Sequence, residues 1–144
     1  SVTVHCPDAT TNIIAGIMPA KALSEKGVPI AMGCDIGGGQ HAAVYRQVAR
    51  AVQLSKLKEF YEPEGNGSIT FAQAFHMATK AGGSVFDRAG SLEKGYRFNA
   101  LVLDGLEDEG FTLSPEERAE RFCYAGDDRN IIGRFIDGKE IILP

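Results

Sequence analysis

A continuous apolar run that ends in a glycine-rich turn constrains the fold of this chain more than any other feature. Residues Val28–Met32 contain no polar side chain, and Gly33–Gly39 follows with a single carboxylate, Asp35. A strand without alternating polar residues is typical of a parallel sheet that is covered on both faces. The sequence therefore predicts an α/β fold with this strand in its interior.

The residues before this run complete a strand-helix-strand unit. Val2–His5 predicts a short strand that ends before Pro7, because proline cannot donate to a sheet ladder. A loop through Thr10–Asn12 and a helix over about Pro19–Lys26 are expected next. Strands joined by one helix are usually parallel, so both strands should end at the same edge of the sheet.

The middle of the chain predicts two further helices. The first covers about Gln40–Leu57 and carries Val44, Val48 and Val52 on one stripe. The second begins at Thr70, which forms a capping box with Gln73, and ends near Gly82-Gly83.

The last third of the chain predicts a strand, a helix and a hairpin. The strand spans Tyr96–Asp104, and the helix begins at Ser114-Pro115 and covers about 115–123. The hairpin joins Ile131–Ile136 to Lys139–Leu143 through Asp137-Gly138, the residue types of a type I′ turn.

Composition excludes several classes of protein. The chain has 144 residues, of which 44% are hydrophobic, which is typical of one globular domain. Its net charge of −4 argues against a nucleic-acid partner, and no apolar run approaches the ~18 residues of a membrane span. Three widely spaced cysteines form no disulfide framework; Cys6 and Cys34 are expected to be small buried residues, in a reducing, cytoplasmic setting.

The carboxylate in the glycine-rich turn is the leading candidate for chemistry, and three interpretations of it remain open. Asp35 follows a parallel strand, the position where such folds carry functional groups, so it could be a metal ligand or general base. Alternatively, Gly37–Gly39 could bind an anion through backbone N–H groups and the next helix. In the third interpretation Asp35 only caps that helix.

Histidines supply the other candidates. His5 ends the first strand and His41 follows the glycines, so both could reach the rim that carries Asp35 and Gly37. A hydrogen-bonded structural role for His5, and an exposed helical position for His41, are the plainer alternatives. His76 is expected in packing or at the surface.

Gly126–Asn130 could be a cation or substrate site, although a turn held by Asx-type bonds and an Asp–Arg pair is the favoured interpretation.

Several motifs together resemble a known family. Four segments of this chain look like the C-terminal part of the amidohydrolase superfamily: His5-Cys6-Pro7, Gly16–Pro19, Gly33–Asp35 and Val52–Leu57. Phe122–Ile131, followed by Asp137-Gly138-Lys139, is similar to the end of the guanine deaminases within that superfamily.

This resemblance implies a fold larger than the chain. It implies a metal-dependent (β/α)₈ TIM-like barrel with a small β-sandwich, of which this chain would be a C-terminal fragment. Residues 1–88 would supply the last two β/α units and the following helices. Residues 89–144 would contribute to the composite sandwich, with one helix at about 115–123.

The resemblance also implies a reaction. Guanine deaminases hydrolyse a C–N bond of a cyclic amidine, converting guanine and water to xanthine and ammonia in purine catabolism. Asp35 falls on the family's aspartate that ligates zinc, with iron as an alternative, contacts the substrate and carries a proton from the metal-bound water to it. His5 falls on a family histidine that is not a metal ligand. Cys34, and Ala9-Thr10, depart from the family's pattern.

The resemblance assigns the other ligands of the single divalent ion to segments that would precede Ser1. The isolated chain is therefore expected to be inactive and to need the missing N-terminal half of the protein, which would form a homodimer when complete. Two alternatives remain: a chlorohydrolase-like amidohydrolase acting on C–N or C–Cl bonds of purine or triazine rings, and a non-catalytic α/β module that binds anions at Gly37–Gly39.

Overall fold

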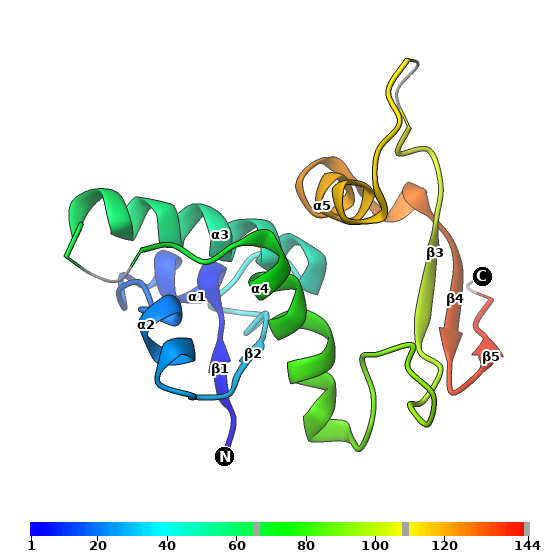
Figure 1. The fold of residues 1–144 in the computed structure, drawn as a ribbon, viewed down its shortest axis with the longest axis horizontal. Coiled ribbons are helices and arrows are strands. Elements are labelled where there is room, and N and C mark those ends of the chain that lie inside the picture. Colours follow the sequence, from blue (N-terminus) through cyan, green and yellow to red (C-terminus); the bar gives the residue numbers. More distant parts are fainter. Residues whose placement is uncertain (65–66, 108–109, 143–144) are drawn as a thin grey trace.

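Helices and two small sheets make up the fold. A computed structural model describes residues 1–64, 67–107 and 110–142 (Figure 1). In chain order the elements are β1 (Thr3–His5), α1 (Pro7–Asn12), α2 (Ala20–Glu25), β2 (Ile30–Met32), α3 (Val44–Tyr61), α4 (Phe71–His76), the π-helix η1 (Met77–Ala81), the 3₁₀ helix η2 (Ser84–Phe86), β3 (Ala100–Leu103), α5 (Pro115–Ala125), the 3₁₀ helix η3 (Asp128–Asn130), β4 (Ile131–Ile136) and β5 (Lys139–Glu140). The expected α/β class is confirmed. None of the helices in these ranges is both long and apolar enough to cross a membrane.

The two strands of the first unit are parallel neighbours, as predicted. Thr3 pairs with Ile30 and His5 with Met32, and the Gly33 amide donates to the His5 carbonyl at 2.9 Å. All three residues of β2 are buried, which agrees with its uninterrupted apolar sequence. Both strands therefore end at one edge, where the chain continues into α1 and into the glycine-rich segment.

The core lies between β2 and the helices α3, α4 and α5. Val48 and Val52 of α3 are buried, whereas Val44 at its start is exposed. The rings of Tyr45 and Phe122, 4.4 Å apart between centroids, pack α5 against α3. The core cluster consists of Ala20, Ile30, Met32, Val48, Ala51, Val52, Ile69, Phe71, Ala74, Met77 and Cys123.

A second sheet of three antiparallel strands, ordered β3-β4-β5, lies on the far side of α4 from β1 and β2 (Figure 1). The predicted hairpin turn is confirmed, since Asp137 and Gly138 both have positive φ values, 49° and 76°. The second arm is assigned as strand only over Lys139–Glu140, and Leu143 lies outside the described residues.

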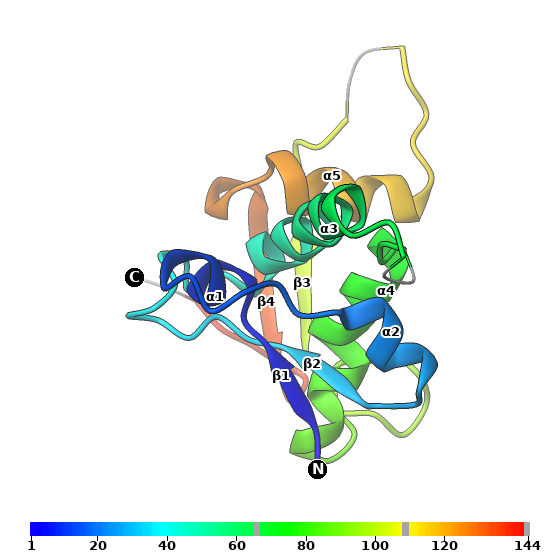
Figure 2. The ribbon, with the colours of Figure 1, turned by 90° about the vertical axis from the view of Figure 1, so that its left-hand side faces the viewer.

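Two element boundaries differ from those expected. Residues 7–12 form the helix α1 and not a loop, because Pro7 occupies its first turn and the Thr10 and Thr11 hydroxyls donate to carbonyls one turn earlier. The helix expected from Gln40 begins at Val44. The segment before α3 is held instead by side chains of α1, which lies beside it in Figure 2.

Candidate functional site

The glycine-rich segment after β2 folds into a tight turn that presents Asp35. In this glycine turn, residues 35–39, Asp35 has a φ of 49° and its carbonyl accepts from the amides of Gly38 and Gly39 at 3.1 and 2.8 Å. The Asp35 side chain is exposed, and no hydrogen bond or ion pair engages it within the described residues. The turn therefore fixes the backbone of Asp35 and leaves its carboxylate available.

The structure removes two of the interpretations considered for the glycine turn. Asp35 does not cap the next helix, because the N-cap of α3 is Ala43, without a side-chain bond. The turn also does not offer a row of free donors to an anion, since the Gly38 and Gly39 amides bond to the Asp35 carbonyl and α3 starts only at Val44. The anion-loop interpretation thus lacks the donors and the helix end that it required.

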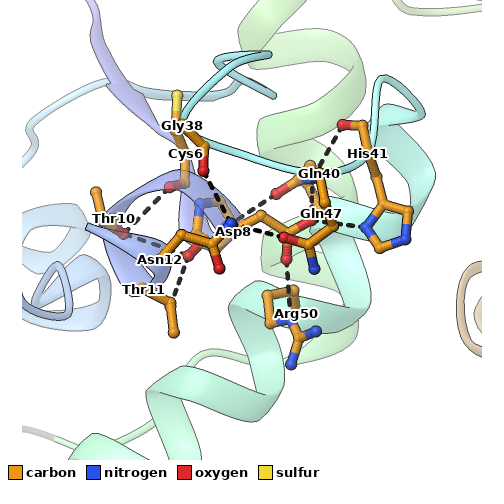
Figure 3. Close-up of polar contacts among 11 residues, drawn as sticks. Cys6, Asp8, Thr10, Thr11, Asn12, Gly38, Gln40, His41, Gln47 and Arg50 are labelled. Carbon is orange, nitrogen blue, oxygen red and sulfur yellow. Dashed lines mark hydrogen bonds and ion pairs between the residues drawn. The ribbon is translucent and has the colours of Figure 1, made fainter. Parts of the chain in front are cut away.

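A buried carboxylate from α1 anchors the segment that follows the glycine turn. Oδ2 of Asp8 accepts from Gln47 Nε2 at 2.8 Å and lies 2.9 Å from His41 Nδ1, and Oδ1 accepts from Arg50 Nε at 3.0 Å (Figure 3). The Asp8 amide also donates to Gln47 Oε1 at 3.2 Å. We call these four residues the Asp8 cluster.

The Asp8 cluster keeps its carboxylate ionised despite burial. The Asp8 side chain is 2% exposed. Burial by itself would raise the pKa of Asp8, but the hydrogen bonds from His41, Gln47 and Arg50 and the Arg50 charge outweigh it and lower that pKa. Sequence reasoning missed Asp8, because its partners lie 33 to 42 positions away and no local pattern marks them.

Further contacts hold the glycine turn against α1. Asn12 Nδ2 donates to the Gly38 carbonyl at 2.8 Å and to Gln40 Oε1 at 2.9 Å (Figure 3). A Cβ atom at position 39 would come within 2.5 Å of the Cys34 carbonyl and 3.3 Å of the Asp8 Cβ. Glycine is therefore required where the turn meets α1.

The predicted rim histidines have different surroundings. One alternative placed His41 at an exposed helical position. In the structure His41 precedes α3, and its half-buried ring contacts Asp8. His5 is 2% exposed and its Nδ1 has no hydrogen-bond partner among the described residues. Desolvation lowers the pKa of His5 to about 4, so its imidazole is neutral at pH 7. His76 is exposed on α4.

The cysteines near the glycine turn are half-buried, whereas full burial was expected. Burial raises the pKa of Cys6, aided by Asp35 and Cys34, and burial with the nearby Asp8 raises that of Cys34. Cys34 Sγ donates to the Ala42 carbonyl at 3.0 Å. Both thiols therefore stay protonated at neutral pH, which does not favour a nucleophilic role.

The Gly126–Asn130 segment is the predicted structural turn. Asp127 accepts from the Arg129 amide at 2.9 Å and from its guanidinium at 2.6 Å. Asn130 Oδ1 accepts from the Asp127 amide at 3.0 Å. The favoured interpretation of an Asx-type turn with an Asp–Arg pair is confirmed.

The part of the chain that the structure describes contains no complete metal site. Across residues 1–64, 67–107 and 110–142, no three His, Cys, Asp or Glu side chains come together in a group that could hold a metal ion. The free Asp35 carboxylate is a suitable oxygen donor for one position of such an ion. A complete site would need further ligands from outside these residues.

Comparison with known proteins identifies the family of this chain. The model of the amidohydrolase family matches residues 1–141. The chain belongs to the amidohydrolase family. Amidohydrolases are generally metal-dependent hydrolases, and the family includes deaminases that act on C–N bonds.

The chain is similar to several guanine deaminases. It is 27% identical to guanine deaminase of Dictyostelium discoideum over 95% of this chain and 32% of that protein. The crystal structure of guanine deaminase from C. acetobutylicum, with guanine bound in the active site, superposes with a TM-score of 0.89 at 40% identity, covering 96% of this chain and 33% of that one.

A more distant structure shares the fold alone. Zinc-bound adenosine deaminase of Xanthomonas campestris has a TM-score of 0.77 at 24% identity and is covered to 31%. The amidohydrolase chain thus spans about a third of the length of each of these relatives.

Proposed function

We propose that this chain supplies the Asp35 side of the active site of a guanine deaminase-like amidohydrolase, which converts guanine and water to xanthine and ammonia. The observation that carries the proposal is its similarity, at 40% identity and a TM-score of 0.89, to a guanine deaminase with guanine in its active site. The part of the enzyme outside these 144 residues would supply the remaining ligands and the rest of the substrate pocket.

The chemistry proposed for Asp35 is the one that the family resemblance implies, and its position supports it. Zinc, the ion we propose for the complete site, acts as a Lewis acid and lowers the pKa of water when it is bound. The Asp35 carboxylate would hold one position of that ion. It would also take a proton from the attacking water and deliver it to the departing nitrogen of guanine, as a general base and then a general acid.

Local structure supports this role for Asp35. Its side chain is exposed at the end of a buried parallel strand, where α/β folds carry their functional groups. Two hydrogen bonds within the glycine turn fix the backbone of Asp35, so its side chain extends from a fixed position. Within the described residues no ion pair competes for it. Gly37, at a φ of 112°, gives the turn its left-handed geometry.

The wider context forms part of the same proposal. Residues 1–88 would form the last two β/α units of a (β/α)₈ barrel, and residues 89–144 would join a small β-sandwich. The complete enzyme would act in the cytoplasm, in purine catabolism, as a homodimer. The exposed face of β1 and the length of the relatives support a larger barrel.

The test of this proposal is Asp35→Asn in the protein that carries this chain. Asparagine tolerates the positive φ of this position, so only the carboxylate is lost. We expect ammonia release from guanine to fall by about 10²–10⁴-fold, with reduced zinc content.

Asp87→Asn is the matched control, because Asp87 is also exposed and has a φ of 57°. It should leave turnover unchanged. Equal activity of Asp35→Asn and the wild type would refute the role of Asp35. Chloride release from a chlorotriazine, without ammonia release from guanine, would favour the chlorohydrolase alternative.

A further inference from the structure

The Asp8 cluster determines which ring nitrogen of His41 carries a proton. The lowered pKa of Asp8 keeps its carboxylate ionised, and an ionised carboxylate only accepts hydrogen bonds. The His41 Nδ1, 2.9 Å from Oδ2 of Asp8, must therefore donate. In a neutral imidazole this leaves Nε2 unprotonated, with its lone pair free to accept a hydrogen bond.

The ring of His41 is also oriented outward from the cluster. Its side chain is 39% exposed, and Nε2 points away from Asp8, Gln47 and Arg50 (Figure 3). His41 belongs to the same connection between β2 and α3 as Asp35, at the edge where both parallel strands end. The acceptor thus lies on the loop that carries the proposed catalytic carboxylate.

The loop that carries His41 has anchors besides its bond to Asp8. Asn12 already bonds to Gly38 and Gln40, and Gln47 Nε2 also reaches the His41 carbonyl at 3.4 Å. Gln47 Nε2 and Arg50 Nε donate to different oxygens of Asp8, so a neutral amide at position 8 would turn its N–H₂ group toward one of these donors and could not replace the carboxylate. Besides pairing with Arg50, the charge of Asp8 favours a single tautomer of His41.

We propose that His41 accepts a hydrogen bond through Nε2 from an N–H group of the bound purine, and that Asp8 is the residue that positions it. This inference rests on the proposed function. It assigns the substrate class as a planar heterocycle with an N–H donor on the edge that faces His41. His41 would then determine substrate affinity, without taking part in proton transfer.

Two variants of His41 separate this role from a purely structural one. His41→Asn keeps a donor near the position of Nδ1 and thus the bond to Asp8, but it removes the acceptor. His41→Gln places an amide oxygen near the position of Nε2. We expect His41→Asn to raise KM for guanine about tenfold with kcat within about twofold, and His41→Gln, which restores the acceptor but loses the bond to Asp8, to recover part of that loss. His76→Asn, at an exposed position of α4, is the control and should leave both constants unchanged.

The outcomes are distinguishable. A wild-type enzyme that does not turn over guanine contradicts the proposed function and with it this inference. Normal turnover with an unchanged KM in His41→Asn overturns the inference alone. A second readout is the ¹⁵N spectrum of the His41 imidazole: we expect the Nδ1–H tautomer in the wild type and a mixture in Asp8→Asn. An Nε2–H tautomer in the wild type would leave no acceptor and would also overturn it.

Discussion

Burial affects two ionisable side chains of this chain in opposite ways. His5 and Asp8 are 2% and 3% exposed. The Nδ1 of His5 has no hydrogen-bond partner among the described residues, and burial lowers the pKa of His5 to about 4. Asp8 has three side-chain donors that more than offset its desolvation. Burial therefore leaves a neutral imidazole beside β2 and a charged carboxylate in α1, because only the carboxylate has partners.

The neutral imidazole makes the stability of the chain depend on pH. Between pH 6.5 and about 4 the unfolded chain binds a proton at His5 that the folded chain does not bind, so stability falls as the pH falls. We expect a loss of roughly 3 kcal/mol across this interval, measured by urea unfolding. Asp8 acts in the same direction only below its ordinary pKa of 3.8.

A hydrophobic replacement isolates the contribution of His5. His5→Leu should remove most of the pH dependence in this interval, because it removes the titrating group. His76→Gln is the matched control: it removes an exposed histidine and should leave the slope unchanged. A slope that persists in His5→Leu would mean that another group is responsible.

The helices of this chain begin in two physically different ways. α4 and α5 start at complete capping boxes, Thr70 with Gln73 and Ser114 with Glu117. α3, the longest helix, starts at Ala43 without a side-chain cap. Local sequence therefore sets the first residue of α4 and α5, whereas α3 begins where side chains of α1 stop holding the preceding segment.

The start of α5 depends on a single hydroxyl. Ser114 Oγ accepts from the Glu117 amide at 3.2 Å, and Glu117 returns a bond to the Ser114 amide at 2.7 Å. Ser114→Ala should lower the free energy of unfolding by about 1 kcal/mol in urea denaturation. Ser114→Asp retains an acceptor at the N-cap and should lose much less. If both variants lost the same amount, the cap would not be the cause.

At the scale of the whole molecule, the proposed site is divided between this chain and the rest of the protein. The described residues contain no group of three side chains able to hold a metal ion, although Asp35 is free to serve as one ligand. The relatives with the same fold are about three times as long. The proposed division therefore makes zinc binding a property of the complete enzyme.

This division predicts the behaviour of the 144-residue chain by itself. We expect substoichiometric zinc by metal analysis and no ammonia release from guanine, because one carboxylate cannot satisfy a four-coordinate ion. Co-expression with the amino-terminal part of the same protein should restore both. One zinc ion per isolated chain would contradict the division of the site.

Local patterns in the sequence determined the capping boxes at Thr70 and Ser114, the turn at Asp137-Gly138 and the position of Asp35 after a buried strand. Each of these features depends on residues that are only a few positions apart. Tertiary structure alone decided that Asp8 is buried and charged and that His41 is oriented by it. Those contacts join residues 33 or more positions apart, so they exist only once α1, the glycine turn and α3 have packed together.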